Sequence, residues 1–277
     1  MNTKIKPLWS PTAEQLAVAK MTLFSEESAL KWDREFDNYS ALHRWSVEEP
    51  EEFWVSVWDF CGLIASSRGD RVFETSAGKP GALFFPDAQF NFARNLLRRR
   101  DNGDAVIFWS EDKLHRKLTH ADLYLAVAGL AEALKNVGIK SGDRVCGFMP
   151  NMPETIIAML AASSIGAVWS SCSPDFGVSG VIDRFGQIKP RIIFGVDGYY
   201  YNGKWHDSLS KLAKIREQLP SVEHVVVTPF SEGKLKINEI KDSVIWDDFI
   251  SYSENIEFVD LPFNHPLYVL YSSGTTG

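Results

Sequence analysis

The sequence predicts an α/β fold, a mainly parallel sheet flanked by helices and preceded by a mostly helical extension. From Ala105 onward, short β-rich runs alternate with segments of helical periodicity. Repeated strand–helix–strand units are joined by right-handed crossovers and therefore form parallel sheets. The run 222–227 is rich in β-branched residues, as is typical of a strand covered on both faces. We expect a division near residue 100, with the extension at 1–100 and the α/β part at 101–277.

The extension is rich in Trp, Phe and acidic residues and contains one clear helical pattern. Apolar residues recur at near-helical spacing between Ser46 and Trp58, which predicts a helix there. Ser46 and Glu49 have the spacing of a capping box, and Pro50 would fall in the first turn, where proline is tolerated. A turn-rich stretch at 75–87 precedes a short helix that ends at the basic run 98–100, which we interpret as a solvated helix end.

The first predicted elements of the α/β part are a hairpin and a long helix. A β-rich run at 105–110 turns at Glu111 and Asp112 into a second run at 113–118. Thr119 and Asp122 then carry the signal of a helix N-cap, and the apolar stripe that follows has helical spacing. Gly138 is expected to end this helix.

Alternating strands and helices continue to residue 227. A strand at 145–149 precedes a buried helix that starts at Pro153 and ends at Gly166. A second strand at 167–172 precedes a helix that Pro190 ends, and a third at 191–196 precedes a helix that Pro220 ends. The run 222–227 completes the set.

Composition excludes several classes of function. The chain has 277 residues, of which 45% are hydrophobic, and a formal net charge of -7, so it lacks the clustered basic charge of a nucleic-acid surface. No run approaches the roughly 20 apolar residues of a membrane span, and the N-terminus lacks the apolar core of a secretory signal. The cysteines and histidines show no disulfide or zinc spacing. We therefore expect a cytoplasmic protein that holds no metal by itself, with Cys146 and Cys172 as unreactive core thiols.

The end of the sequence joins an apolar run, 267–271, to a loop of small hydroxyl residues and glycines, 272–277. Glycines allow close backbone approach, and successive N–H groups and hydroxyls can converge on an anion such as a phosphate group. Glycine and serine also occur in ordinary surface turns, so composition alone leaves both interpretations open. The loop lacks the ending and the glycine spacing of a Walker motif, which disfavours a P-loop kinase or GTPase.

The segment 271–277, Tyr-Ser-Ser-Gly-Thr-Thr-Gly, resembles the start of the phosphate-loop signature of the adenylate-forming superfamily. Four upstream segments resemble that superfamily in order and spacing, namely 142–145, 149–154, 166–168 and 190–194. The resemblance spans about residues 100–277. It implies the N-terminal subdomain of the adenylate-forming fold and ATP-dependent activation of a carboxylate.

The extension resembles one branch of this superfamily. Segment 42–54 is similar to the leading domain of acetyl-CoA synthetases. The continuation most resembles the acetoacetyl-CoA synthetase group, in segments 57–60, 80–82, 85–88 and 95–97. The resemblance implies an AMP-forming acid–thiol ligase that joins acetoacetate to coenzyme A through an acyl-adenylate, using ATP and Mg²⁺. Three alternatives stay open: an acetyl- or propionyl-CoA synthetase, a non-catalytic scaffold acting as a binding module, and a ligase with an acceptor other than free coenzyme A. The extension argues against the last.

The resemblance also implies site residues. The ATP phosphates would be bound by hydroxyls and backbone N–H groups of Ser272, Ser273, Gly274, Thr275, Thr276 and Gly277. By register with acetyl-CoA synthetases, coenzyme A would approach Ser173, Pro174, Asp175, Tyr201 and Lys204.

The coenzyme A assignment has an equally good alternative, a surface loop with an incidental lysine. Lys204 retains the positive charge that this register requires, whereas Tyr201 does not. Arg184 could reach the same region or pair locally. The catalytic residues, the adenine-binding segment and the acyl pocket are expected beyond Gly277, so residues 1–277 alone are expected to be inactive. Neither the acid nor the oligomeric state follows from the sequence.

Overall fold

The computed structural model describes residues 7–75, 81–111, 114–230 and 235–272. The chain divides into two compact units, Met1–Ala88 and Gln89–Gly277. In the described residues, no helix combines the length and the apolar character needed to cross a membrane.

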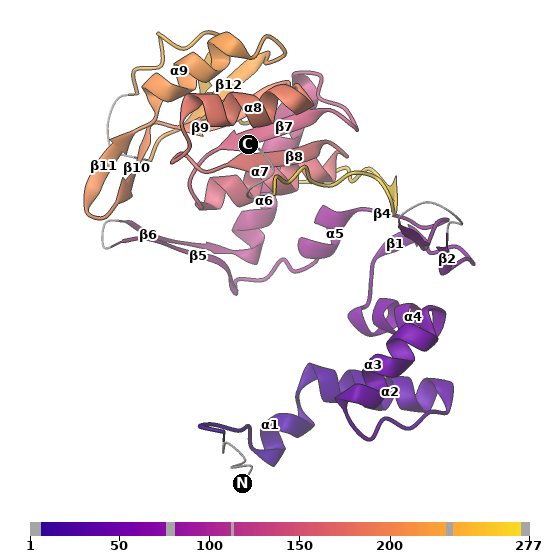
Figure 1. Cartoon of the computed structure of the whole chain (residues 1–277). Helices are drawn as coiled ribbons and strands as arrows, with labels where there is room; N and C mark the ends of the chain where they lie inside the picture. Colours follow the sequence, from indigo (N-terminus) through magenta and orange to yellow (C-terminus); the bar gives the residue numbers. More distant parts are fainter. Residues whose placement is uncertain (1–6, 76–80, 112–113, 231–234, 273–277) are drawn as a thin grey trace. The chain divides into compact units, whose positions relative to one another are not determined.

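The N-terminal unit is built mainly from helices (Figure 1). The ring of Phe24 packs edge-on against the rings of Phe53 and Phe60, with centroids 5.9 and 5.4 Å apart, and Leu42 and Trp45 complete the buried cluster. A short antiparallel pair, β2 with β3, follows the helices. The elements of this unit are α1 (Ala13–Ala17), α2 (Lys20–Trp32), α3 (Tyr39–Glu48), α4 (Pro50–Cys61), β1 (Ala65–Ser67), β2 (Phe73–Thr75) and β3 (Ala82–Phe84).

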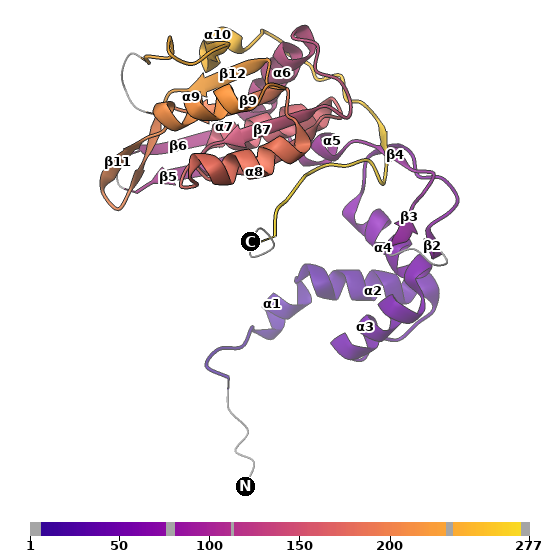
Figure 2. The ribbon, with the colours of Figure 1, turned by 45° about the horizontal axis from the view of Figure 1, so that its top comes forward.

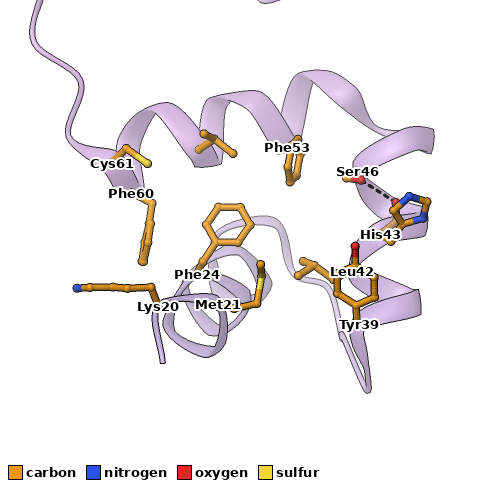
Figure 3. A pocket seen from close by; sticks show the side chains of 11 residues that line it. Lys20, Met21, Phe24, Tyr39, Leu42, His43, Ser46, Phe53, Phe60 and Cys61 are labelled. Atoms are coloured by element: carbon orange, nitrogen blue, oxygen red, sulfur yellow. Dashed lines mark hydrogen bonds between the residues drawn. The ribbon is translucent and has the colours of Figure 1, made fainter. Parts of the chain in front are cut away.

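The predicted capping box at Ser46 is wrong. Ser46 lies inside α3, where its Oγ donates to the carbonyl oxygen of His43 at 2.7 Å (Figure 3). The next helix, α4, begins at Pro50, and Glu49 at its N-cap makes no side-chain capping bond. A residue before proline is driven out of the α region, and Glu49 accordingly has φ -125° and ψ 62°. The helical pattern from Ser46 therefore belongs to two helices, with proline at the first position of the second.

The C-terminal unit contains the predicted alternation of strands and helices. The elements are β4 (Gln89–Phe90), α5 (Phe92–Leu96), β5 (Asp104–Ser110), β6 (Leu114–Thr119), α6 (His120–Asn136), β7 (Arg144–Phe148), α7 (Pro153–Ser164), β8 (Val168–Cys172), α8 (Val178–Ile188), β9 (Ile192–Val196), β10 (Gly198–Tyr201), β11 (Lys204–Asp207), α9 (Leu209–Gln218), β12 (His224–Thr228), β13 (Ser243–Ile245), α10 (Trp246–Phe249) and β14 (Leu261–Pro262).

A parallel five-stranded sheet, in the order β13-β12-β9-β7-β8, forms the centre of this unit. One face packs against α6 and α7 in a core that includes Val145, Trp169 and Phe194. The other face packs against α8 and α9 in a second core that includes Phe148 and Ile193. Figure 2 shows α8 and α9 in front of the sheet. The predicted α/β class, with helices on both faces of a parallel sheet, is confirmed.

The start of α6 follows the predicted capping pattern. The Thr119 hydroxyl accepts from the backbone N–H of Asp122 at 3.0 Å, and the Asp122 carboxylate accepts from the backbone N–H of Thr119 at 3.1 Å. This reciprocal pair satisfies two donors that a helix N-terminus otherwise leaves unbonded. Gly138 follows the end of the helix with φ 79°, a left-handed conformation that glycine adopts without strain.

Asn91 joins three segments of the C-terminal unit at a fully buried position. Its Nδ2 donates to the carbonyl oxygens of Ser163, Ser164 and Val259 at 3.1, 3.0 and 2.8 Å. Its Oδ1 accepts from the backbone N–H of Arg94 at 3.2 Å and caps α5. One amide thus connects the start of α5, the end of α7 and the segment before β14.

We predict that Asn91→Asp destabilises the protein by about 3 kcal/mol, because an acceptor then faces three buried carbonyl oxygens that have lost their donor. Urea unfolding measures the change. The matched control is Asn255→Asp at an exposed position, expected within about 0.5 kcal/mol of the wild type. Equal losses for the two variants would contradict this role for the Asn91 amide.

Candidate functional site

The final described segment lies along the edge of the central sheet. Tyr268 forms a parallel bridge with Trp169 of β8. The N–H of Trp169 donates to the Leu267 carbonyl at 3.1 Å, and the N–H of Val269 donates to the Trp169 carbonyl at 2.9 Å. Among the described residues, the apolar run 267–271 therefore contributes a single bridge at the edge of β8. Because this segment is parallel to β8, it delivers Tyr271 and Ser272 to the edge where the strands have their carboxyl ends, which is where open α/β sheets bind ligands.

Ser272 is the predicted phosphate-binding residue that falls within the described residues, and it is exposed. Ser273, Gly274, Thr275, Thr276 and Gly277 lie outside the described residues. The residue before them, Tyr271, is half-buried, and its hydroxyl donates to the backbone carbonyl of Arg184 in α8 at 2.9 Å. Burial raises the pKa of the Tyr271 hydroxyl, so the phenol stays protonated as a donor.

The turn after β8 carries three of the predicted coenzyme A residues. The Ser173 hydroxyl donates to one carboxylate oxygen of Asp175 at 2.9 Å. The other carboxylate oxygen accepts from the hydroxyl of Tyr199 in β10 at 2.5 Å. Lys211 of α9 donates to the carbonyl oxygen of Pro174 at 2.9 Å. The turn is thus bonded to two elements that come later in the sequence.

The other two predicted coenzyme A residues lie opposite each other on the hairpin of β10 and β11. Tyr201 pairs in register with Lys204, and both side chains are exposed. At the hairpin's tip, the N–H of Gly203 donates to the carboxylate of Glu111 at 2.9 Å. Since Tyr199 lies on the same strand as Tyr201, its bond to Asp175 joins the turn and the hairpin. The structure therefore links the turn 173–175 and the hairpin that carries Tyr201 and Lys204 through the bond between Tyr199 and Asp175. We refer to the turn and the hairpin together as this assembly.

Tyr199 was missed by sequence reasoning. It stands first in a run of three tyrosines, and strand alternation places Tyr199 and Tyr201 on one face with Tyr200 on the other. Tyr199 is buried, and its ring stacks on His206 with centroids 5.3 Å apart. Alternation could have indicated a shared face, but no local pattern indicates the partner carboxylate 24 residues earlier.

Hydrogen bonds and burial shift the pKa values of the titratable groups in this assembly. The Tyr199 hydroxyl and then the Ser173 hydroxyl lower the pKa of the Asp175 carboxyl. Burial, with a further contribution from the Asp175 carboxylate, raises the pKa of Tyr199 to about 12. A lowered carboxyl pKa means that the ionised form stabilises the fold. That contribution is present above the unfolded pKa and is lost as pH falls through the folded value.

The two cysteines of the sheet are buried, as expected. Burial raises the pKa of Cys146 well above its usual value and that of Cys172 to about 11. Such thiols stay protonated at neutral pH and are poor nucleophiles. Within the described part of the chain, no group of three His, Cys, Asp or Glu side chains is placed to hold a metal ion.

A separate cavity lies in the N-terminal unit between α2, α3 and α4 (Figure 3). Its volume is about 340 Å³, and its walls are mainly apolar. The aromatic rings of Phe24, Phe53 and Phe60 belong to the buried cluster of this unit, so the cavity is a gap beside a small core. The lining residues are Lys20, Met21, Phe24, Tyr39, Leu42, His43, Ser46, Phe53, Val57, Phe60 and Cys61.

Comparison with known families agrees with this geometry. A family model described as AMP-binding enzyme matches residues 92–277, which includes the whole parallel sheet and the segment at its carboxyl edge. The chain belongs to the AMP-binding enzyme family. A second model, described as the acetyl-coenzyme A synthetase N-terminus, matches residues 39–96 of this family member.

Relatives of this AMP-binding chain share nearly all of its length. It is 44% identical over 275 residues to an acetoacetyl-coenzyme A synthetase of Rhizobium meliloti (strain 1021), covering 98% of this chain and 42% of the relative. It is 41% identical over 283 residues to an acetoacetyl-CoA synthetase of Xenopus tropicalis, with the same coverage of 98% and 42%. The solved structure of acetoacetyl-CoA synthetase from Streptomyces lividans matches with a TM-score of 0.90 and 38% identity, over 98% of this chain and 42% of that one.

These comparisons confirm the resemblance inferred from the motifs and the fold that it implied. The chain spans 42% of the length of the curated relatives above. The matched part contains the parallel sheet and the segment 267–272 that pairs with its edge, while the relatives contain further residues.

We predict that Tyr199→Phe raises the pKa of Asp175 toward the ordinary value. The variant loses the Tyr199 hydroxyl, which lowers this pKa more than the Ser173 hydroxyl does. A carboxyl-carbon NMR titration of Asp175 measures this directly. Tyr201→Phe serves as the control, since its side chain is 65% exposed and it should leave the titration unchanged. An Asp175 midpoint that is the same in Tyr199→Phe and wild type would contradict the assignment of the Tyr199 hydroxyl as the main cause.

Proposed function

We propose that the full-length protein is an ATP-dependent acid–thiol ligase that makes acetoacetyl-CoA from acetoacetate, ATP and coenzyme A. The observation that carries this proposal is the 44% identity to an acetoacetyl-coenzyme A synthetase, which runs through 98% of this chain. Both parts of the chain contribute, since the N-terminal model matches residues 39–96 and the AMP-binding model matches residues 92–277.

The reaction proceeds in two steps. The acetoacetate carboxylate attacks the α-phosphorus of ATP, which breaks the bond to pyrophosphate and forms an acyl-adenylate. The thiolate of coenzyme A then attacks the acyl carbon, and AMP leaves as coenzyme A becomes acylated. The first step brings two anions together, so hydrogen-bond donors must offset the negative charge. Mg²⁺ would supply further charge neutralisation on the phosphates.

The phosphates of ATP would be held by Ser272, Ser273, Gly274, Thr275, Thr276 and Gly277. Two observations support this placement. Ser272 is exposed at the carboxyl edge of the sheet, and Tyr271 before it is held by a hydrogen bond to α8. Hydroxyl donors that follow a held residue can meet an anion with little loss of conformational freedom.

Coenzyme A would bind along the turn 173–175 and the hairpin of β10 and β11. The Lys204 ammonium would pair with a phosphate group, and the exposed Tyr201 ring would offer an apolar face beside it. Ser173 and Asp175 would keep the turn in place through their bonds to each other and to Tyr199. The division between the extension at 1–100 and the α/β part at 101–277 stays a prediction, and so does a cytoplasmic location.

The decisive experiment measures AMP release by the full-length protein with acetoacetate, acetate or propionate, each with and without coenzyme A. We expect the highest kcat/KM with acetoacetate, and thioester only when coenzyme A is present. A higher kcat/KM with acetate or propionate would mean that this acid, and not acetoacetate, is the substrate. Absence of AMP release with all three acids would reject the ligase function.

We predict that Lys204→Ala raises the KM for coenzyme A about tenfold, the loss expected for one hydrogen bond to a charged group, with the KM for ATP unchanged. Steady-state kinetics of the full-length enzyme measure both constants. Lys214→Ala, an exposed lysine on α9, is the matched control and should leave both constants at the wild-type values. An unchanged KM for coenzyme A in Lys204→Ala would remove this residue from the site.

A further inference from the structure

Arg184 of α8 lies between the two proposed nucleotide sites. Its guanidinium lies over the ring of Phe176 at 4.6 Å from the centroid and faces the ring of Tyr271 at 5.7 Å. Phe176 ends the turn that carries Asp175, because its N–H donates to the carbonyl of Ser173 at 3.2 Å. Tyr271 immediately precedes the proposed phosphate loop. One side chain therefore contacts the neighbours of both sites.

The orientation of Arg184 is determined within its own helix. Its Nη1 donates to the carbonyl of Gly180 one turn earlier at 2.7 Å, and its backbone carbonyl accepts the Tyr271 hydroxyl at 2.9 Å. Among the described residues, no carboxylate lies within ion-pair distance of this guanidinium. Its charge is therefore directed at two aromatic faces, an arrangement that stabilises by cation–π attraction when it is partly desolvated.

We propose that Arg184 is a positioning residue that couples the turn 173–176 to the start of the phosphate loop. The inference rests on the proposed function, which places coenzyme A at the turn and the ATP phosphates after Tyr271. A shift of Phe176 changes the surface on which the guanidinium rests, and a shift of the guanidinium changes the packing of the Tyr271 ring. Tyr271 is additionally bonded to the backbone of the same residue, so both contacts move with α8.

The coupling requires two properties of Arg184 together, a positive charge and a planar group that covers an aromatic ring. Lysine retains the charge but not the planar stacking surface, and alanine retains neither. The series Arg184→Lys and Arg184→Ala therefore separates a graded loss of positioning from a general loss of fold. Gln187→Ala is the matched control, because Gln187 is exposed on the same helix and bonds only to the carbonyl of Asp183 among the contacts described.

The test uses the full-length enzyme with the acid that the wild type activates best. We expect Arg184→Ala to raise the KM for ATP about tenfold, as loss of a partly desolvated cation–π contact implies. Arg184→Lys should recover about half of this effect on a logarithmic scale. Hydrogen exchange of peptides covering 267–277 should be faster in Arg184→Ala, and added coenzyme A should slow it in the wild type but not in the variant. Gln187→Ala should match the wild type throughout.

Two outcomes would overturn the proposal. One is a lower kcat and lower thermal stability in Arg184→Ala with both KM values and the exchange of 267–277 unchanged, which indicates a purely structural role. The other is additivity of Arg184→Ala and Phe176→Leu in the KM for ATP, because Phe176→Leu removes the ring on which the guanidinium rests and residues that act through one contact give non-additive effects. If the wild type activates no acid, the proposed function fails by itself, and the exchange response to coenzyme A still tests the coupling.

Discussion

The parallel pairing of residues 267–269 with the edge of β8 determines at which edge of the sheet Tyr271 and Ser272 lie. Two backbone hydrogen bonds and the bond from the Ser170 hydroxyl to the Val269 carbonyl align this segment with the sheet. A parallel strand must end at the same edge as its neighbours, so Tyr271 emerges beside the turn after β8. An antiparallel pairing would send the hydroxyl-rich loop to the opposite edge, away from that turn and from α8. The direction of one pairing thus places both proposed sites together.

The segments that resemble the superfamily upstream of this loop are mostly architectural. Asp143 accepts from the backbone N–H of Lys140 at 2.9 Å and from the Arg191 guanidinium at 2.7 Å. Arg191 also pairs with Glu223, so one cation joins the segments that lead into three strands at the amino end of the sheet. The motifs 142–145 and 190–194 therefore stabilise the amino end of the sheet, whereas 149–154 follows the carboxyl end of β7. A family resemblance carried partly by such structural contacts indicates the fold more directly than the ligand.

Local signals predicted most of the fold, and long-range bonds account for what they missed. The α6 capping box and the helices that end near prolines follow from neighbours in sequence, and the structure contains them. The predicted helix began before Pro50 because proline is tolerated in a first turn. That prediction did not include the restriction that proline places on the backbone of the preceding residue, Glu49. The hairpin of β10 and β11 went unpredicted because its turn, Asn202-Gly203, lies within an aromatic run without clear alternation. Its bond to Asp175 joins elements that only the folded sheet brings together.

A chain with a net charge of -7 can still bind polyanions, because binding responds to the local arrangement of donors and not to the total charge. At the carboxyl edge the proposed donors are hydroxyls, backbone N–H groups and the Lys204 ammonium, and the Arg184 guanidinium adds positive charge nearby. Arg184 is covered by aromatic rings, so its charge is screened less than that of a fully exposed residue. A net charge of -7 disfavours nucleic acids, which need extended basic charge, and is compatible with a small anion bound by a local set of donors.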